Sequence, residues 1–273
     1  MRGPDGPVEP VCAPPGVPAG GAAGSAAGSA VQRVLRAEVA RMRDRRPDRA
    51  PRVLDVGGGS GAWAVPLARL GCAVTVVDNS PNALAALHRR ARDAGVADLV
   101  AAVQGDVDAL AEVAPTGGAD LVLGHGLLEV VDDAEAAVAA LALATAPGSA
   151  VSVLVAGRYA AVLARTLSGK LAEARAVLTD PDGRFGPDDA LRRRLDAAAL
   201  HRLLDPVAGL RVEVLQGDGV LDAWVPGSVH DGGPAAARAV AELEALAVAA
   251  APLRDVSTRL HALARRPDDA PSA

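Results

Sequence analysis

Aromatic side chains are nearly absent from this chain. Among 273 residues there are two tryptophans, one tyrosine and one phenylalanine, although half of all residues are apolar. A chain of this length can bury a sizeable core in one large domain. We therefore expect a core built from alanine, valine and leucine.

The chain also has few cysteines and no net positive charge. The two cysteines, Cys12 and Cys72, suggest neither a disulfide framework nor a metal site. A formal net charge of −5 gives no general support for binding to nucleic acid or to a membrane. The first residues contain no apolar segment typical of a signal peptide, so a reducing cytoplasm is the simplest compartment.

One apolar stretch, from Ala136 to Gly157, has 22 residues without charge and is long enough to span a bilayer. Pro147-Gly148 interrupts it. Acidic residues precede its first half as they would precede a helix, and the second half is typical of a buried strand. We expect a helix followed by a strand and no membrane contact.

The ends of the chain differ in composition from its middle. Residues 1–28 contain six prolines and seven glycines, a composition that predicts a disordered tail. We expect residues 268–273 to be frayed. Between them, residues 29–267 form one predicted domain, which begins with a helix over 29–46. The arginines of this helix could bind RNA phosphates, but a solvated helix face is favoured.

Strand-like and helix-like segments alternate from residue 53 to residue 155, which predicts a parallel sheet with helices on both faces. Two later segments add strands, and we expect a doubly wound, mostly parallel sheet of seven strands. One helix is predicted over 159–178, and a helical, lid-like insertion is expected near 158–205.

The first strand, within VLDVGGGSG, passes through Asp55 into a glycine-rich turn. Glycines there permit positive φ and close approach of a ligand to the backbone, and a helix amino-terminus follows. Two types of ligand are compatible with the turn. Gly57, Gly59 and Ala62, with Asp78 about twenty residues later, make a passable NAD(P) fingerprint of an oxidoreductase. That interpretation leaves Asp55, the Gly105-Asp106 pair and the HGLLE stretch from His125 unexplained.

The same features resemble the class I S-adenosylmethionine-dependent methyltransferases over about residues 30 to 160. The resemblance implies the Rossmann-like fold of that class and S-adenosyl-L-methionine as cofactor. Its first motif matches Asp55, Gly57, Gly59 and Gly61. The acid that binds the ribose hydroxyls falls on Asp78, and the adenine-binding acid and amide fall on Asp106 and Val107. A carboxylate suits both roles because hydroxyl and amino groups donate to it.

Within that class, residues 52 to about 157 resemble the bacterial tRNA 5-carboxymethoxyuridine methyltransferase group. This resemblance implies cofactor contacts from Gly57, Gly58, Asp78 and His125, and a carboxylate on a wobble uridine as methyl acceptor. The chain departs from the group in its substrate half. It has no arginine within residues 20–30, and small or apolar residues replace the expected aromatic, polar and basic ones at Ala156, Gly157, Gly219 and Leu221.

Methyl transfer depends mainly on alignment and exclusion of water, so no catalytic acid or base is assigned. Arg158 and Tyr159 could hold an anionic acceptor, although both fit an ordinary helix start. The run Arg192–Arg194 could touch phosphate, but a solvated face is favoured. The leading hypothesis is methyl transfer to a tRNA carboxylate or a small carboxylate. A Rossmann oxidoreductase and a non-catalytic cofactor-binding module remain as alternatives.

Overall fold

The computed structural model describes residues 29–268. The predicted tail over 1–28 lies outside the described residues, as does the predicted frayed end except for Asp268.

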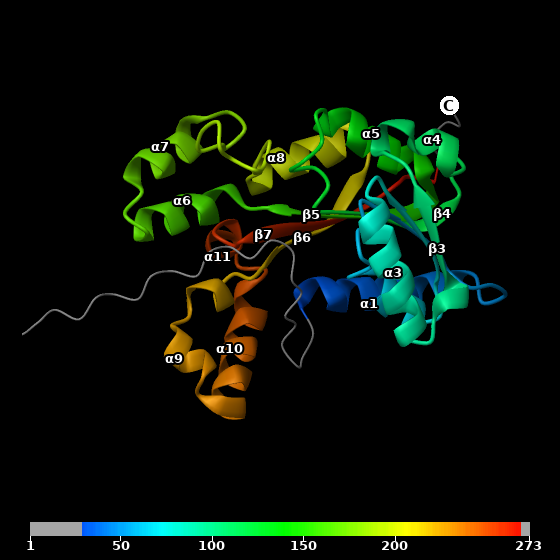
Figure 1. Cartoon of the computed structure of the whole chain (residues 1–273), viewed down its shortest axis with the longest axis horizontal. Helices are drawn as coiled ribbons and strands as arrows, with labels where there is room; N and C mark the ends of the chain where they lie inside the picture. The colour runs from blue at the N-terminus through cyan, green and yellow to red at the C-terminus, as the bar shows by residue number, and fades with distance from the viewer. Residues whose placement is uncertain (1–28, 269–273) are drawn as a thin grey trace, which may run out of the picture.

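One seven-stranded sheet forms the centre of the domain (Figure 1), in the order β3-β2-β1-β4-β5-β7-β6. The first five strands are parallel, and β7 is antiparallel to both of its neighbours. The predicted mostly parallel, doubly wound sheet is therefore confirmed. The strands are β1 (Arg52–Val56), β2 (Ala73–Asp78), β3 (Val100–Gln104), β4 (Ala119–His125), β5 (Thr145–Ala156), β6 (Arg211–Asp218) and β7 (Arg259–Arg265).

Helices cover both faces of this sheet, because alternate residues of each strand point to opposite sides. Val53, Leu121 and Leu263 face one side, which packs against α1 (Ala30–Arg45), α2 (Ala64–Arg69) and α3 (Pro81–Asp93). Leu54 and Val122 face the other side, which packs against α4 (Leu110–Val113), α5 (Ala134–Ala144) and α8 (Ala197–Arg202). Both cores consist mainly of alanine, valine and leucine, as the composition predicts.

The uncharged run from 136 to 157 forms most of α5 and all of β5, which confirms the predicted helix and strand. Among the described residues, no helix has both the length and the apolarity needed to cross a bilayer.

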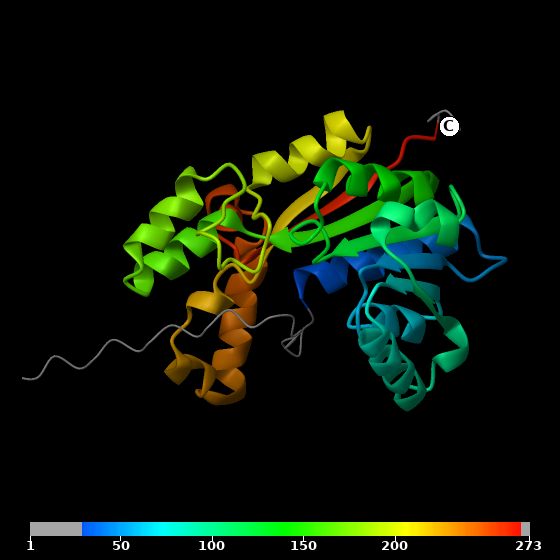
Figure 2. The same cartoon turned by 45° about the horizontal axis from the view of Figure 1, so that its top comes forward.

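Two helical insertions extend beyond the carboxyl ends of the parallel strands (Figures 1 and 2). One follows β5 and contains α6 (Arg158–Leu167) and α7 (Leu171–Thr179). The single helix predicted over 159–178 is wrong, because Gly169 adopts a φ of 72° and the chain turns there.

The other insertion joins β6 to β7 through α9 (Gly227–His230), α10 (Gly233–Ala247) and α11 (Ala251–Asp255), of which the sequence predicts only α10. Four short segments complete the structure: η1 (Ala97–Leu99), η2 (Val107–Ala109), η3 (Leu203–Val207) and η4 (Asp222–Trp224).

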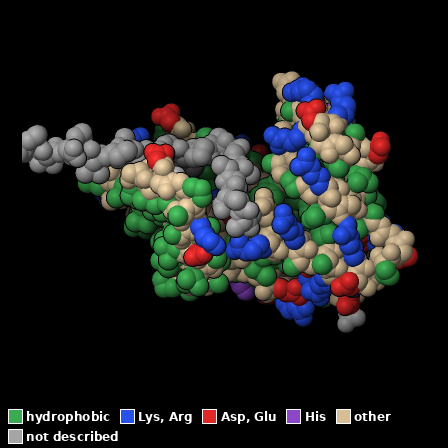
Figure 3. Space-filling view, turned by 90° about the horizontal axis from the view of Figure 1, so that it is seen from below, with side chains coloured by type: hydrophobic (Ala, Val, Ile, Leu, Met, Phe, Trp, Pro, Cys, Tyr) green, Lys and Arg blue, Asp and Glu red, His purple; other side chains and the backbone are tan. Residues whose placement is uncertain are grey.

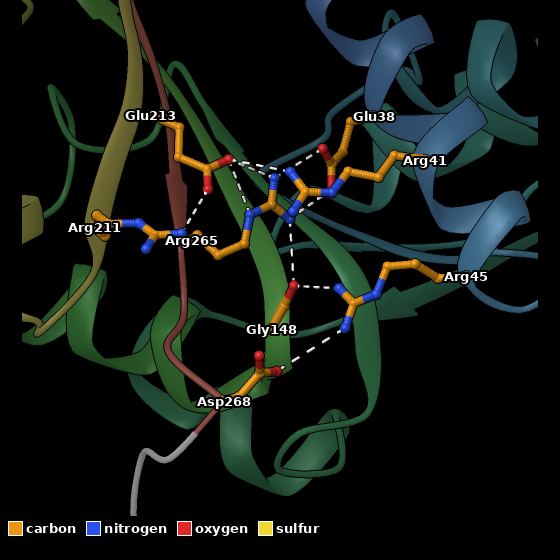
Figure 4. Close-up of polar contacts among 8 residues, drawn as sticks. All are labelled: Glu38, Arg41, Arg45, Gly148, Arg211, Glu213, Arg265 and Asp268. Atoms are coloured by element: carbon orange, nitrogen blue, oxygen red, sulfur yellow. Dashed lines mark hydrogen bonds and ion pairs between the residues drawn. The ribbon is translucent and has the colours of Figure 1, made fainter.

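An ion-pair cluster joins α1 to the opposite, amino-terminal edge of the parallel strands (Figure 4). The guanidinium of Arg265 contacts the carboxylates of Glu38 and Glu213, with N–O distances of 2.8 and 2.7 Å. Arg41 pairs with Glu213, and Arg45 donates to the carbonyl oxygen of Gly148. The cluster fixes the position of α1 on β6 and β7.

Arginine side chains gather over the α1 and α3 side of one face, and hydrophobic side chains gather near α9 and α10 (Figure 3). Three of the α1 arginines contact the protein itself, because Arg43 donates to the carbonyl of Leu70 in addition to the contacts of Arg41 and Arg45. These contacts give Arg41, Arg43 and Arg45 a structural role.

Candidate active site

The glycine-rich turn connects the end of β1 to α2 and passes directly over the Asp55 side chain. Gly57, Gly59 and Gly61 have φ values of 70°, 55° and 79°, a region that residues with a Cβ atom rarely adopt. A Cβ atom at Gly58 would lie 2.5 Å from the Asp55 carboxylate and 2.9 Å from Val76. The turn therefore needs glycine, and α2 begins at Ala64, two residues later than the sequence predicts.

Asp55 is a buried carboxylate without a protein partner. The residue is 1% exposed, and neither carboxylate oxygen has a hydrogen bond. Burial, and to a lesser extent the charge of Asp78, raises the pKa of Asp55 to about 7. An unpaired buried carboxylate is costly unless a ligand or a proton compensates for it. Asp55 thus provides an acceptor beneath the glycine turn.

Asp78, at the end of β2, holds the turn from its other side. One carboxylate oxygen accepts the Gly59 N–H at 2.8 Å, and the other accepts the Ser80 N–H at 2.9 Å. The cap of α3 comes from Ser80, whose hydroxyl accepts the Ala83 N–H, so Asp78 is not occupied as a helix cap. Each carboxylate oxygen retains a further lone pair for a ligand hydroxyl.

Asp106 follows β3 and lies near Asp78. Its carboxylate accepts a hydrogen bond from Asn79 at 3.3 Å, which joins the ends of β2 and β3. Asp106 occupies the N-cap position of η2, but its side chain makes no capping hydrogen bond. Val107, which begins η2, is buried. The acids at 55, 78 and 106 therefore lie at three adjacent strand ends.

His125 ends β4, next to β1. Its Nε2 lies 2.8 Å from the hydroxyl of Ser152, and its Nδ1 is buried without a partner. The ring of Trp63, just beyond the glycine turn, meets the His125 ring at 4.7 Å between centroids and 90° between planes. Burial, with the nearby His261 and Arg259 contributing less, lowers the pKa of His125 well below its usual value. His125 is thus a neutral ring beside the turn.

Sequence reasoning missed Trp63 and Glu129. Glu129 lies in the loop after β4, and its Oε2 atom is buried without a hydrogen bond. Burial raises the pKa of Glu129 to about 7, against the opposing effects of backbone N–H groups and of Arg259 and Arg193. Its position in HGLLE was a possible signal, but its burial depends on the segment at 192–195, which is distant in sequence.

The arginines that the sequence associates with an acceptor mainly contact the protein. Arg158, at the start of α6, donates to the carbonyl oxygens of Asp180 and Pro181, and its Nε is buried without a partner. The adjacent Tyr159 is exposed. Arg193 donates to three carbonyl groups of the loop after β4, at Leu128, Val131 and Asp132.

The flanking arginines also make protein contacts. Arg194 pairs with Asp189 at 2.5 Å and is buried, while Arg192 pairs with Asp132 at 2.7 Å. The favoured interpretation of Arg192–Arg194 as a solvated face holds for Arg192, which is exposed. It is wrong for Arg193, which holds the loop that contains Glu129, and for Arg194, which is buried against Asp189.

The small residues in the substrate half have local structural causes. A Cβ atom at Gly157 would overlap the carbonyl oxygen of Ser257. Gly219 has a φ of 68°, and a Cβ atom there would lie 2.5 Å from the Thr258 hydroxyl. Ala156 ends β5, and Leu221 packs against a small cluster around Val220. Packing alone thus accounts for glycine at two of the four positions.

Residues 53–148 match the family model of a methyltransferase domain. This match covers the part of the chain from β1 to the start of β5. The matched segment includes the glycine turn and the strand ends that carry Asp78, Asp106 and His125. No curated protein sequence matches the chain significantly.

Solved structures share the fold of this chain at low sequence identity. An S-adenosylmethionine-dependent methyltransferase from Methanosarcina mazei has a TM-score of 0.56 and 14% identity, covering 83% of this chain and 97% of the other. Magnesium protoporphyrin IX methyltransferase from Synechocystis PCC 6803, with bound S-adenosylhomocysteine, has a TM-score of 0.54 and 14% identity, covering 86% and 83%. The 4+2 cyclase SpnF has a TM-score of 0.51 and 20% identity, covering 86% and 82%.

The cyclase illustrates that this fold is compatible with more than one reaction. The family match and the class I fold together support an S-adenosylmethionine-dependent methyltransferase. The resemblance to the tRNA-modifying group is not confirmed by these comparisons. Among the described residues, no cluster of three or more His, Cys, Asp or Glu side chains could bind a metal ion.

Proposed function

We propose that this protein transfers the methyl group of S-adenosylmethionine, which binds at the carboxyl ends of β1 to β4. The hydrogen bond from the Gly59 N–H to the Asp78 carboxylate carries the proposal, because it joins the glycine turn to the acid that would accept the ribose hydroxyls. Asp106 and the Val107 N–H would contact adenine. Gly57, Gly58 and Gly61 would let the cofactor approach the backbone, and the unpartnered Asp55 oxygens suit its positively charged end.

When bound, the cofactor supplies a methyl group that its sulfonium already activates. The residues of this chain then have to orient the acceptor and exclude water. The two insertions at the same edge of the sheet are placed for that purpose, since α6 follows β5 directly and α10 and α11 precede β7. We propose that the first insertion, which contains α6 and α7, covers the site as a lid.

We propose a carboxylate as acceptor, on a small molecule or on a tRNA wobble uridine. The resemblance to the tRNA-modifying group supports the carboxylate. The small molecule has more support than tRNA, because four arginines that could bind phosphates, Arg41, Arg43, Arg193 and Arg194, contact this protein instead. Arg158, whose Nε has no partner, and the exposed Tyr159 are the proposed acceptor-binding residues.

Glu129 favours a second acceptor class. A carboxylate nucleophile needs no proton acceptor, whereas a hydroxyl or amine must lose a proton during or after transfer. The buried Oε2 of Glu129, beyond the end of β4, could receive that proton. A small molecule with a hydroxyl or amine is therefore the second candidate.

The test combines binding with product analysis. The purified protein is titrated calorimetrically with S-adenosylhomocysteine and with NAD, and is then incubated with methyl-labelled cofactor plus total tRNA or a small-molecule extract. We expect micromolar binding of S-adenosylhomocysteine and label in small molecules. Release of the label by mild base identifies a methyl ester, and stable label identifies an ether or amine.

Other outcomes separate the alternatives. Label in tRNA that mild base releases identifies the wobble carboxylate. Binding of S-adenosylhomocysteine without labelled product from either source favours the non-catalytic module. Binding of NAD alone identifies the oxidoreductase and overturns the proposal.

A further inference from the structure

Four buried polar side chains form a continuous row across four neighbouring strands. Gln216 of β6 contacts Nδ1 of His261 in β7 at 3.2 Å, and Nε2 of His261 contacts the hydroxyl of Ser152 in β5 at 2.9 Å. The same hydroxyl contacts Nε2 of His125 in β4 at 2.8 Å. All four residues are at most 9% exposed. The row lies on the face that packs against α1, because His125 and Ser152 share the parity of Leu123 and Leu154.

The hydrogen bonds in this row have one direction. The amide nitrogen of Gln216 can only donate, so Nδ1 of His261 must accept. A neutral His261 then carries its proton on Nε2 and donates it to Ser152. The Ser152 hydroxyl uses its own proton toward Nε2 of His125. A neutral His125 must therefore carry its proton on Nδ1.

Both rings are neutral at physiological pH. Burial lowers the pKa of His261 to about 3 and lowers the pKa of His125 well below its usual value. The ring of His261, whose centroid lies 6.0 Å from that of His125, and the nearby Arg259 further lower the pKa of His125.

The row ends at the proposed cofactor site. Nδ1 of His125 is buried and has no protein partner, which is costly for a donor unless a ligand accepts its proton. His125 belongs to the strand next to β1 and contacts Trp63, which follows the glycine turn. A ligand bound over that turn is therefore next to this donor.

We propose that Gln216, His261 and Ser152 are positioning residues that hold His125 as the neutral Nδ1–H tautomer, so that it donates to the carboxylate of the bound cofactor. The inference rests on the proposed function. The carboxylate is the anionic group of S-adenosylmethionine, and the acids Asp55 and Asp78 at the turn would repel it. A neutral donor binds a carboxylate and would not bind the cofactor's ammonium group.

The first experiment measures tautomers in the ligand-free protein. Nitrogen-15 NMR of the histidine rings distinguishes protonated from bare ring nitrogens, and the variants His125→Phe and His261→Phe assign the signals. At pH 7 we expect His125 to be protonated only on Nδ1 and His261 only on Nε2. A His125 protonated on Nε2, or charged, overturns the proposal whether or not the protein transfers methyl groups.

The second experiment breaks the row. Ser152→Ala and Gln216→Met each remove the constraint on His125, and we expect affinity for S-adenosylhomocysteine to fall about tenfold. Affinity for methylthioadenosine, which lacks the carboxylate, should not change. Ser149→Ala is the matched control, because Ser149 is a buried serine of the same strand outside the row.

A loss of affinity for both ligands would indicate a merely structural role and would overturn the proposal, as would an unchanged affinity for S-adenosylhomocysteine. If wild-type protein binds neither ligand, the proposed function fails. The histidine tautomers then still show whether the hydrogen bonds of the row run in one direction from Gln216 to His125.

Discussion

Glu38 in α1 and Arg265 in β7 are 227 positions apart in the sequence and form a two-point ion pair, with N–O distances of 2.8 and 3.0 Å. Both side chains are 5% exposed. Removing the charge of Glu38 leaves buried Arg265 with the carboxylate of Glu213 alone, and loss of a buried contact is more costly than loss of an exposed pair.

We predict that Glu38→Gln lowers the free energy of unfolding by roughly 3 kcal/mol. Urea denaturation monitored by circular dichroism measures it. The control is Glu242→Gln, because the pair between Arg238 and Glu242 is exposed and should contribute about 0.5 kcal/mol or less. Equal effects of the two variants would show that burial of the Arg265 pair adds nothing.

Glu213 makes the stability dependent on acid pH. Hydrogen bonds from Arg265 and then Arg211, against the effect of burial, lower the pKa of Glu213 to about 2. A lowered carboxyl pKa contributes stability that is present above the ordinary value of 4.5 and is lost as the pH falls toward 2. We predict that Glu213→Gln is less stable than wild type at pH 6 and that the difference shrinks below pH 4. Melting temperatures across that range test this, and a constant difference would contradict it.

Asp55 makes stability depend on pH in the opposite direction to Glu213. Its pKa is raised to about 7, so its ionisation in the folded state is unfavourable, and stability is lost as the pH rises from about 4 through 7. We predict that ligand-free Asp55→Asn is more stable than wild type at pH 8, has no such advantage at pH 4, and binds the cofactor more weakly. Thermal unfolding at the two pH values, with and without S-adenosylhomocysteine, checks both parts. Greater stability of wild type at pH 8 would mean that a partner compensates the carboxylate.

For Asp78→Ala we predict a loss of affinity for S-adenosylhomocysteine of roughly ten- to a hundredfold, because a polar ligand group would lose its acceptor. Calorimetric titration measures it. Asp98→Ala, an exposed acid in η1, serves as control and should bind normally. Unchanged binding in both variants would mean that the ribose lies elsewhere.

Gly58→Ala should reduce both stability and cofactor affinity, because its Cβ atom would displace the Asp55 carboxylate and Val76. Gly227→Ala is the comparison, since a Cβ atom at Gly227 meets no other atom within 4 Å. Melting temperature and affinity are compared for the two variants. A Gly58 variant that behaves like the Gly227 variant would show that the turn adjusts easily.

The sequence predicts the parallel strands and the places of Asp55, Asp78 and Asp106 because these features are local. Each acid follows an apolar strand, and parallel strand ends meet at one edge of the sheet. The break at Gly169 was missed because apolar residues continue at helical spacing across it. Glycine in an apparent helix is a weak signal by itself.

The row through His125, Ser152, His261 and Gln216 could not be predicted from local pattern. It exists because β7 enters the sheet antiparallel between β5 and β6, which places Gln216 opposite His261. The pairing of Glu38 with Arg265 depends on the same strand. Both relationships require the tertiary arrangement of segments that are far apart in the sequence.

That arrangement has a consequence for biosynthesis. In the described structure β6 pairs only with β7, which begins at Arg259, whereas β6 ends at Asp218. During translation, β6 therefore emerges from the ribosome with both of its edges unpaired, and the sheet can be completed only after the insertion and β7 have also been synthesised. An unpaired strand edge is a site of aggregation. Ribosomes stalled a few residues before Arg259 should carry a nascent chain that chaperones bind, whereas the released protein should escape them.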